Sequence, residues 1–171
     1  MQRYYTTAGF KGINWPLRDP ERRSQGQPHK LAVLVFILAE AIKKLRAWAA
    51  NSEEAYTPVE LFRGMSNRAI FDEFMVKGGT ELAPMSTTAE LWVALQYTQG
   101  QEGNIHTLLW LRTDNFMNRG VDLTWLSAFP HEKEYLYPPL SFLKPIRPKP
   151  IVLKIGGSAT YQIVELQISM S

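Results

Sequence analysis

The sequence contains no cysteine and only three histidines among its 171 residues. The lack of cysteine excludes disulfides, thiolate metal sites and cysteine nucleophiles. The three histidines lie far apart and lack the spacing of zinc ligands on a helix: His29, His106 and His131. We therefore predict no bound metal, because metal sites need ligands at much more specific spacings.

Several catalytic and nucleotide-binding motifs are also absent. The chain has no glycine-rich dinucleotide fingerprint and no phosphate-binding loop that ends in Gly-Lys-Ser or Gly-Lys-Thr. It has no Gly-x-Ser-x-Gly turn of the kind that presents an esterase serine. An enzyme with this sequence would therefore use carboxylates, hydroxyls and arginine.

The composition is that of an ordinary globular protein, with 45% hydrophobic and 20% charged residues. The net charge of +3 favours anionic ligands, but the positive residues form no long block, so we predict no nucleic-acid partner. Met1 to Lys11 lacks the apolar core of a signal peptide. We expect a monomer that is cytoplasmic, or an effector secreted without a recognisable leader.

One apolar run, Leu31 to Ile42, is interrupted only by Glu40. A membrane span needs about 20 apolar residues, so we predict no span and instead a helix over Lys30–Ala50 that is buried on most faces. Residues 1 to 28 show no periodicity and are expected to form a loop-rich lead-in. The helix that follows, Leu31 to Ala50, could serve as a helical lobe before the first strand or could dock a partner.

The remaining elements are predicted from periodicity and turn residues. Two helices are expected: one begins at Ser66 or Asn67 and ends at Gly78-Gly79, and one is capped by Thr87 with Glu90 and ends near Gly100. Val121 to Phe129 is expected to be a turn-rich connection with a short helical piece. The predicted strands are Val59–Arg63, Thr80–Met85, Ile105–Leu111, Glu134–Tyr137, and a hairpin of Ile151–Ile155 and Tyr161–Ile168 around Gly156-Gly157. This order predicts one α+β domain, with an N-terminal lobe (1–58) and a β-rich core (59–171).

Three short polar motifs could carry chemistry. Glu132 and Glu134 are two residues apart, so an extended backbone would point both carboxylates the same way and Lys133 the opposite way. Paired carboxylates suit a reaction that passes through an oxocarbenium-like sugar cation. The alternative is a solvated charged turn.

The other two motifs have equally simple alternatives. Arg63, at the end of an apolar strand and before Gly64, could present its guanidinium to phosphate oxygens or could form a surface salt bridge. The hydroxyls of Ser86-Thr87-Thr88 could hold a carboxylate in place or could only cap a helix.

The order of these motifs resembles a known family. Arg63, then Ser86-Thr87-Thr88, then Glu132-Lys133-Glu134 is similar to the Arg, Ser-Thr-Ser, Glu-x-Glu series of the arginine-specific, cholera-toxin-like mono-ADP-ribosyltransferases. This family includes vertebrate ecto-enzymes and bacterial toxins. The resemblance covers residues 59 to 143, with Thr88 where serine is usual. It implies a helical N-terminal part followed by a mostly antiparallel split β-sandwich.

The resemblance also implies a role for each residue. NAD would be the substrate, with Arg63 on its phosphates and nicotinamide-side ribose and Gly64 offering its backbone to the nicotinamide amide. Glu134 would hold the ribose 2′-hydroxyl and stabilise the cation, and Glu132 would engage the acceptor. Three further residues are expected at the NAD site: Ser86 to orient Glu134, Thr87, and Tyr97 as an aromatic platform for nicotinamide.

The function implied is transfer of ADP-ribose from NAD to an arginine of a partner protein, with release of nicotinamide. Two alternatives remain open. The same residues would serve an NAD glycohydrolase, in which water replaces the protein acceptor. The chain could also be a catalytically silent interaction module that offers its basic, proline-rich segment Lys144–Pro150 to a partner.

Overall fold

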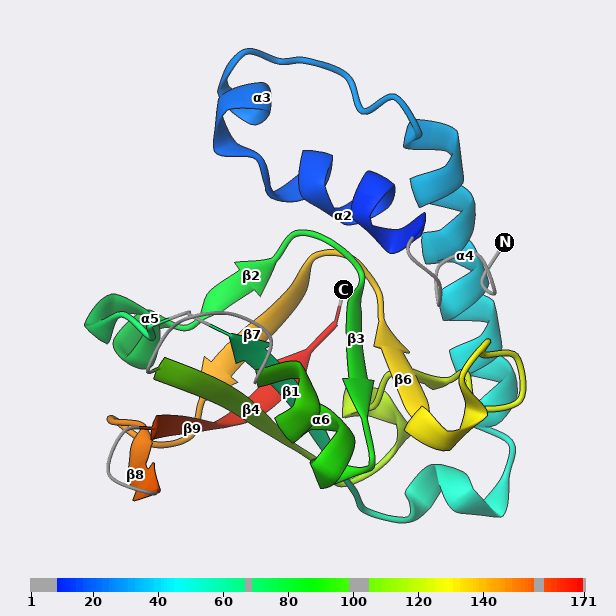
Figure 1. The fold of residues 1–171 in the computed structure, drawn as a ribbon. Coiled ribbons are helices and arrows are strands. Elements are labelled where there is room, and N and C mark those ends of the chain that lie inside the picture. The colour runs from blue at the N-terminus through cyan, green and yellow to red at the C-terminus, as the bar shows by residue number, and fades with distance from the viewer. Residues whose placement is uncertain (1–8, 67–68, 99–104, 156–158, 171) are drawn as a thin grey trace.

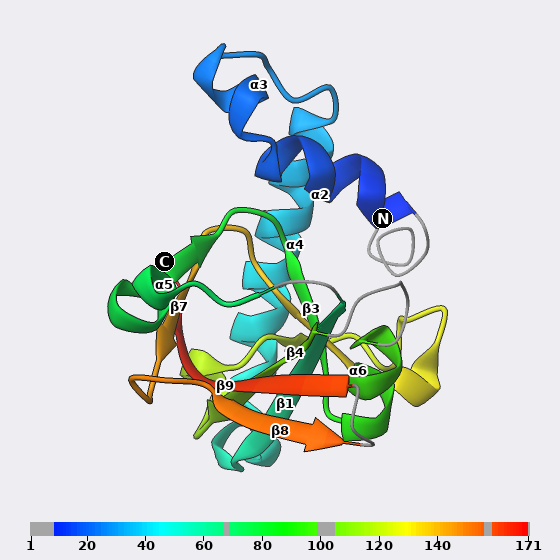
Figure 2. The same ribbon diagram turned by 60° about the vertical axis from the view of Figure 1, so that its left-hand side comes forward.

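The N-terminal third of the chain forms helices that lie along one side of a β-sheet (Figure 1). The structure is a computed structural model and describes residues 9–66, 69–98, 105–155 and 159–170. The helices of this part are α2 (Phe10–Arg18), α3 (Pro20–Ser24) and α4 (Ala32–Ala49), followed by a 3-10 helix, Glu53–Tyr56. The first turns of α4 extend beyond the sheet together with α2 and α3 (Figure 2).

The prediction of a loop-rich lead-in over residues 1 to 28 is wrong for residues 10 to 24, which form α2 and α3. Helix α3 begins where Asp19 accepts hydrogen bonds from the backbone N–H groups of Glu21 and Arg22, with Pro20 in the first turn. Helix α2 contains Pro16, and its stability comes from tertiary packing of one face. Neither short helix has a long apolar stripe, which is why periodicity did not indicate them.

Helix α4 is close to its predicted bounds, but the expectation that most of its faces are buried is wrong. Only Leu38 and Ile42 are fully buried along α4. They pack in a small core with Ile13 of α2 and with Val121, Leu123 and Leu136. A helix that rests on a single layer buries one stripe only, so apolar residues on its other faces are left exposed. Among the described residues, no helix combines the length and apolarity that a membrane crossing would require.

Within the described residues, nine strands form one mixed sheet in the order β2-β7-β9-β4-β1-β3-β6-β5, with β8 paired to β9. Strands β4 and β9 are parallel, and the other pairs are antiparallel. The strands are β1 (Val59–Ser66), β2 (Gly79–Glu81), β3 (Met85–Thr88), β4 (Ile105–Thr113), β5 (Val121–Asp122), β6 (Glu134–Tyr137), β7 (Ser141–Pro145), β8 (Ile151–Ile155) and β9 (Ala159–Ser169).

The sheet is divided where β1 meets β3, because a single residue pair, Phe62 with Thr88, joins the two strands. On one side of this junction β1 pairs with β4 over eight positions, and on the other side β3 pairs with β6 over four. The main core lies under the larger half and includes Leu61, Leu109 and Val164. The predicted α+β class, with its split and mostly antiparallel strands, is confirmed.

Some predicted boundaries are wrong. The strand expected over Thr80–Met85 is two strands, β2 and β3, and helix α5 (Asp72–Lys77) begins later than Ser66. Thr87 lies inside β3 and its hydroxyl donates to the Tyr135 carbonyl, so it does not cap helix α6 (Leu91–Thr98). The Val121 to Phe129 connection contains β5, and the short helical piece follows it at Pro130–Glu132. Asn67, Gly100 and Gly156-Gly157 lie outside the described residues.

Candidate active site

A cavity of about 170 Å³ lies at the junction between the two halves of the sheet. Its walls come from α2, β1, β3, α6 and the segment before β6. The cavity brings together every residue that the sequence predicted for the site: Arg63, Gly64, Ser86, Thr87, Tyr97, Glu132 and Glu134. The remaining lining residues are Phe10, Asn14, Phe62, Thr88, Val93 and Ala94.

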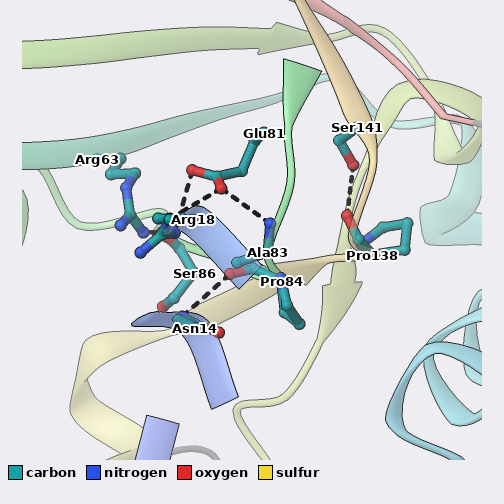
Figure 3. Close-up of polar contacts among 9 residues, drawn as sticks. All are labelled: Asn14, Arg18, Arg63, Glu81, Ala83, Pro84, Ser86, Pro138 and Ser141. Carbon is teal, nitrogen blue, oxygen red and sulfur yellow. Dashed lines mark hydrogen bonds and ion pairs between the residues drawn. The ribbon is translucent and has the colours of Figure 1, made fainter. Parts of the chain in front are cut away.

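Arg63 lies on β1 at the edge of this junction. Its Nη1 donates a 2.6 Å hydrogen bond to the backbone carbonyl of Ser86 on β3 (Figure 3). The bond bridges the two halves of the sheet close to their single pairing point at Phe62 and Thr88. A half-buried guanidinium held in this way keeps a fixed orientation and a full positive charge, since arginine stays protonated in proteins. The cavity therefore has a fixed cation on one wall.

Glu134 is the first residue of β6, and it is buried, with 5% of its surface exposed. Its Oε1 accepts a 2.6 Å hydrogen bond from the Ser86 hydroxyl. Burial raises the pKa of the Glu134 carboxyl, and the charge of Glu132 adds to this effect. The hydrogen bond from Ser86 and the charge of Arg63 act in the opposite direction and lower the same pKa. Ser86 and Arg63 thus favour the carboxylate form in a site whose burial disfavours it.

Glu132 reaches the same cavity by a different backbone path from the one predicted. Residues Pro130–Glu132 form a 3-10 turn, and Lys133 follows with left-handed dihedral angles of φ 43° and ψ 59°. The extended Glu-Lys-Glu segment predicted from the spacing is therefore wrong, although both carboxylates line one cavity. Glu132 Oε1 accepts a 3.1 Å hydrogen bond from the Tyr97 hydroxyl. Burial and the charge of Glu132 raise the pKa of Tyr97 to about 12, so its hydroxyl stays protonated at neutral pH and can donate.

Gly64 is required by packing at this site. A Cβ atom added to Gly64 would lie 1.8 Å from the carbonyl oxygen of Ala94 on α6. No side chain fits there unless the helix backbone moves. The absence of a side chain lets α6 lie directly on β1, next to Arg63, and this contact forms part of the cavity wall. The predicted role of Gly64 toward the nicotinamide amide stays a prediction.

A scan of protein-family models finds no match to this sequence, and a comparison with curated proteins finds no similar one. Solved structures give a clear result. The chain aligns with Plx2a, an ADP-ribosyltransferase toxin from Paenibacillus larvae, at a TM-score of 0.61 and 16% identity, covering 98% of this chain and 83% of that one. It aligns with a mutant of the eukaryotic mono-ADP-ribosyltransferase ART2.2 in complex with NADH at a TM-score of 0.62 and 16% identity, covering 98% of this chain and 63% of that one. Exoenzyme S from Pseudomonas aeruginosa, bound to carba-NAD, aligns at a TM-score of 0.58 and 18% identity, covering 94% of this chain and 68% of that one.

The chain has the ADP-ribosyltransferase fold. It spans about two thirds of the length of Exoenzyme S and of ART2.2. Within this fold, the cavity lies where the two halves of the sheet separate, and the polar motifs of three different strands meet there. The predicted roles of the individual residues toward NAD remain proposals.

Two lining residues on α2 were missed by sequence reasoning, namely Phe10 and Asn14. Asn14 is 3% exposed, and its Nδ2 donates a 3.3 Å hydrogen bond to the Pro84 carbonyl just before β3 (Figure 3). Arg18, one turn further along, forms two hydrogen bonds of 2.9 and 3.1 Å with the Glu81 carboxylate. These contacts hold α2 beside the cavity. No local motif marks them, because they join segments more than 60 residues apart.

The described part of the chain contains no group of three or more histidine, aspartate and glutamate side chains that could hold a metal. His29 Nε2 lies 3.0 Å from the Ile13 carbonyl, and His106 Nδ1 lies 2.7 Å from the Thr98 carbonyl. Both contacts are with backbone carbonyls. The first joins two segments of the N-terminal lobe, and the second joins two segments of the core. The prediction that the chemistry needs no metal stays a prediction.

Proposed function

We propose that this chain is an NAD-dependent mono-ADP-ribosyltransferase that modifies arginine on a partner protein. The observation that carries the proposal is the arrangement of Arg63, Ser86 and Glu134 in one cavity of a chain with the ADP-ribosyltransferase fold. Solved structures with this fold include Exoenzyme S with carba-NAD and ART2.2 with NADH. These complexes support a nicotinamide dinucleotide as the occupant of the cavity.

The proposed reaction breaks the bond between the nicotinamide nitrogen and C1′ of the attached ribose. The bonding electrons leave with nicotinamide, and an oxocarbenium-like cation forms on the sugar. Glu134 would accept a hydrogen bond from the ribose 2′-hydroxyl and place its negative charge beside this cation. The low-dielectric surroundings of a 5% exposed carboxylate strengthen that stabilisation. Arg63 would bind the phosphates, for which a planar guanidinium is well suited.

The acceptor in this proposal is an arginine guanidinium, which is protonated in water and must lose a proton to attack C1′. Glu132 lies in the same cavity as Glu134 and is more accessible, which supports a role for Glu132 in receiving that proton. The pKa of a guanidinium lies far above that of a carboxylic acid. Glu132 would therefore accept the proton only as the new C–N bond forms. This assignment makes Glu132 the residue that favours arginine over water.

The test supplies the purified protein with NAD and with agmatine, a small guanidine. We expect release of nicotinamide and formation of ADP-ribosyl-agmatine, each measured by chromatography and mass spectrometry. Glu134→Gln keeps the shape but removes the charge, and we expect both products to fall by a factor on the order of 100 or more. Glu73→Gln, an exposed carboxylate on α5, is the matched control and should leave both unchanged. A folded Glu134→Gln protein with full activity would overturn the assignment.

The alternative function is NAD glycohydrolysis, with water as the acceptor. One observation favours it: part of the acceptor side of the cavity is open, since Tyr97 beside Glu132 is 58% exposed and water can reach this carboxylate. Free ADP-ribose as the only product, with agmatine and with a cell lysate, would favour this alternative. Mass spectrometry of ADP-ribosylated peptides from the lysate would identify the acceptor residue.

A further inference from the structure

We infer that Tyr97 and the ion pair between Glu90 and Lys133 are positioning residues that hold Glu132 over the cavity and set the balance between transfer to a guanidinium and transfer to water. The inference rests on the proposed function, because it concerns the acceptor side of the same site. The three residues come from α6, from the residue just before it and from the turn that carries Glu132.

The turn has a backbone conformation that needs support. Lys133 adopts left-handed dihedral angles with φ of 43°, which non-glycine residues rarely adopt. Such a residue persists where the surrounding contacts determine the conformation, and these positions cluster at functional sites. Lys133 lies between the two carboxylates, so its conformation decides how Glu132 is presented relative to Glu134.

Contacts with the segment before α6 supply that support. Lys133 Nζ lies 2.5 Å from Glu90 Oε1, and the Ala89 N–H donates a 3.3 Å hydrogen bond to the Lys133 carbonyl. The Thr88 hydroxyl donates to the carbonyl of Glu132. Glu90 itself is fixed, because its carbonyl accepts from the N–H groups of the first turn of α6. The turn is therefore held through both its backbone and its side chains.

Tyr97 holds the carboxylate from the other end of α6. Its hydroxyl donates to Glu132 Oε1 at 3.1 Å, one oxygen of the group that would take the guanidinium proton. Helix α6 cannot shift easily, since Ala94 lies directly against Gly64 of β1. The helix thus connects the strand that carries Arg63 with the turn that carries Glu132, and the spacing between NAD and the acceptor base follows from this connection.

The ion pair is partly exposed, with 57% of the Lys133 side chain and 28% of the Glu90 side chain accessible. Pairs of this kind contribute little to the stability of a protein. A change in this pair should therefore alter the orientation of Glu132 much more than it alters the fold. Product choice is the measurement that separates these two effects.

The first experiment is a charge-reversal cycle. Glu90→Lys and Lys133→Glu should each lower the ratio of ADP-ribosyl-agmatine to free ADP-ribose about tenfold, and the double variant should recover most of that loss. Reversal of the exposed pair on α5, Glu73→Lys with Lys77→Glu, is the control and should leave the ratio unchanged. If the product ratio of the double variant is lowered by the two single losses multiplied together, or by more, the role of the ion pair is overturned.

The second experiment asks whether Tyr97 acts through Glu132. Tyr97→Phe keeps the ring and removes the hydroxyl, and it should lower the product ratio about fivefold in the native background. In the Glu132→Gln background it should have little further effect on the ratio. An equal loss in both backgrounds would mean that Tyr97 acts on NAD directly and would overturn the positioning role.

A third measurement needs no activity. In protein labelled at the tyrosine ring Cζ, the Tyr97 resonance is identified by its loss in Tyr97→Phe, and it should move when Glu132→Gln is introduced. An unmoved resonance would overturn the contact. If no variant releases nicotinamide, the proposed function fails, and the resonance still decides whether Tyr97 holds Glu132.

Discussion

The Ser86 hydroxyl donates a 2.6 Å hydrogen bond to the carboxylate of Glu134, across the antiparallel pair β3 and β6. In that pair Ser86 is opposite Leu136, and Glu134 is opposite Thr88, so the two bonded residues are diagonal neighbours. Diagonal residues on one face of a sheet lie within reach of each other's side chains. The register of two strands therefore creates this contact, and 48 residues separate its partners in the sequence.

Removal of that hydroxyl should change the pH dependence of the proposed activity. The hydrogen bond from Ser86 lowers the pKa of Glu134, so Ser86→Ala should raise it. Activity in the proposed mechanism needs the ionised carboxylate, and the acid limb of the rate profile should therefore move to higher pH. Hydrogen bonds to charged groups are worth about 1.5–3 kcal/mol, which predicts a rate loss of roughly tenfold to a hundredfold at neutral pH. The measurement is nicotinamide release against pH; Ser86→Thr, which keeps a hydroxyl, should restore the profile.

Glu134 should also reduce the stability of the fold at neutral pH. Burial raises its folded pKa above the ordinary value of 4.5, so the carboxyl stabilises the folded state only while it is protonated. That contribution is complete below the unfolded pKa and is lost as the pH rises through the folded pKa. Each unit of such a shift corresponds to about 1.4 kcal/mol.

Glu134→Gln should therefore gain stability over the native chain as the pH rises from about 4 to 8. Urea unfolding at both pH values measures the gain, and Glu73→Gln on α5 provides the exposed control. A stability difference that is the same at both pH values would contradict a raised pKa for Glu134. If the expected gain is found, the native chain keeps at its proposed catalytic position a residue that is less stabilising at neutral pH than its neutral isostere, which is a known cost of active sites.

Gly64 and Gly12 offer a matched test of the packing between β1 and α6. A Cβ at Gly64 would lie 1.8 Å from the Ala94 carbonyl oxygen, whereas a Cβ at Gly12 would meet its nearest neighbour, Leu31, at 3.9 Å. Gly64→Ala should destabilise the fold by more than about 2 kcal/mol, because the helix must move. Gly12→Ala should stabilise α2 by about 0.5–1 kcal/mol, since alanine favours a helix. Thermal unfolding distinguishes the two results, and equal small effects would contradict the close approach.

The sequence was sufficient to predict which polar residues line one cavity, because their order along the chain resembles a known series of motifs. Arg63 and Glu134 lie on strands that the pattern of apolar residues and turns predicted, whereas Ser86 lies on β3, beyond the end of the strand predicted over Thr80–Met85. The path of the chain at Glu132 was not predictable in this way. A 3-10 turn and a left-handed Lys133 depend on contacts with α6, and no local preference of lysine indicates them.

The exposed faces of α4 show a second limit. A run of apolar residues normally indicates burial, but Val33 and Phe36 are 73% and 64% exposed because only one layer packs against the helix. Likewise, α2 carries two cavity residues with no motif of their own, and its position is set by partners far along the chain. Periodicity predicts a helix and its apolar stripe, but it does not predict how many neighbouring elements will cover that helix.

The docking of α2 can be tested through its ion pair with the sheet. Arg18 bonds both oxygens of Glu81, and the Glu81 carboxylate also accepts from the Ala83 N–H just before β3 (Figure 3). Arg18→Ala removes this bidentate contact, which loosens the helix that brings Phe10 and Asn14 to the cavity. We expect the KM for NAD to rise several-fold with a smaller change in kcat, since α2 lines the cavity and does not carry Glu134. Arg23→Ala in α3 is the control, because no ion pair with the sheet involves that residue among the described contacts. Equal KM values for the two variants would show that NAD binding does not depend on the position of α2.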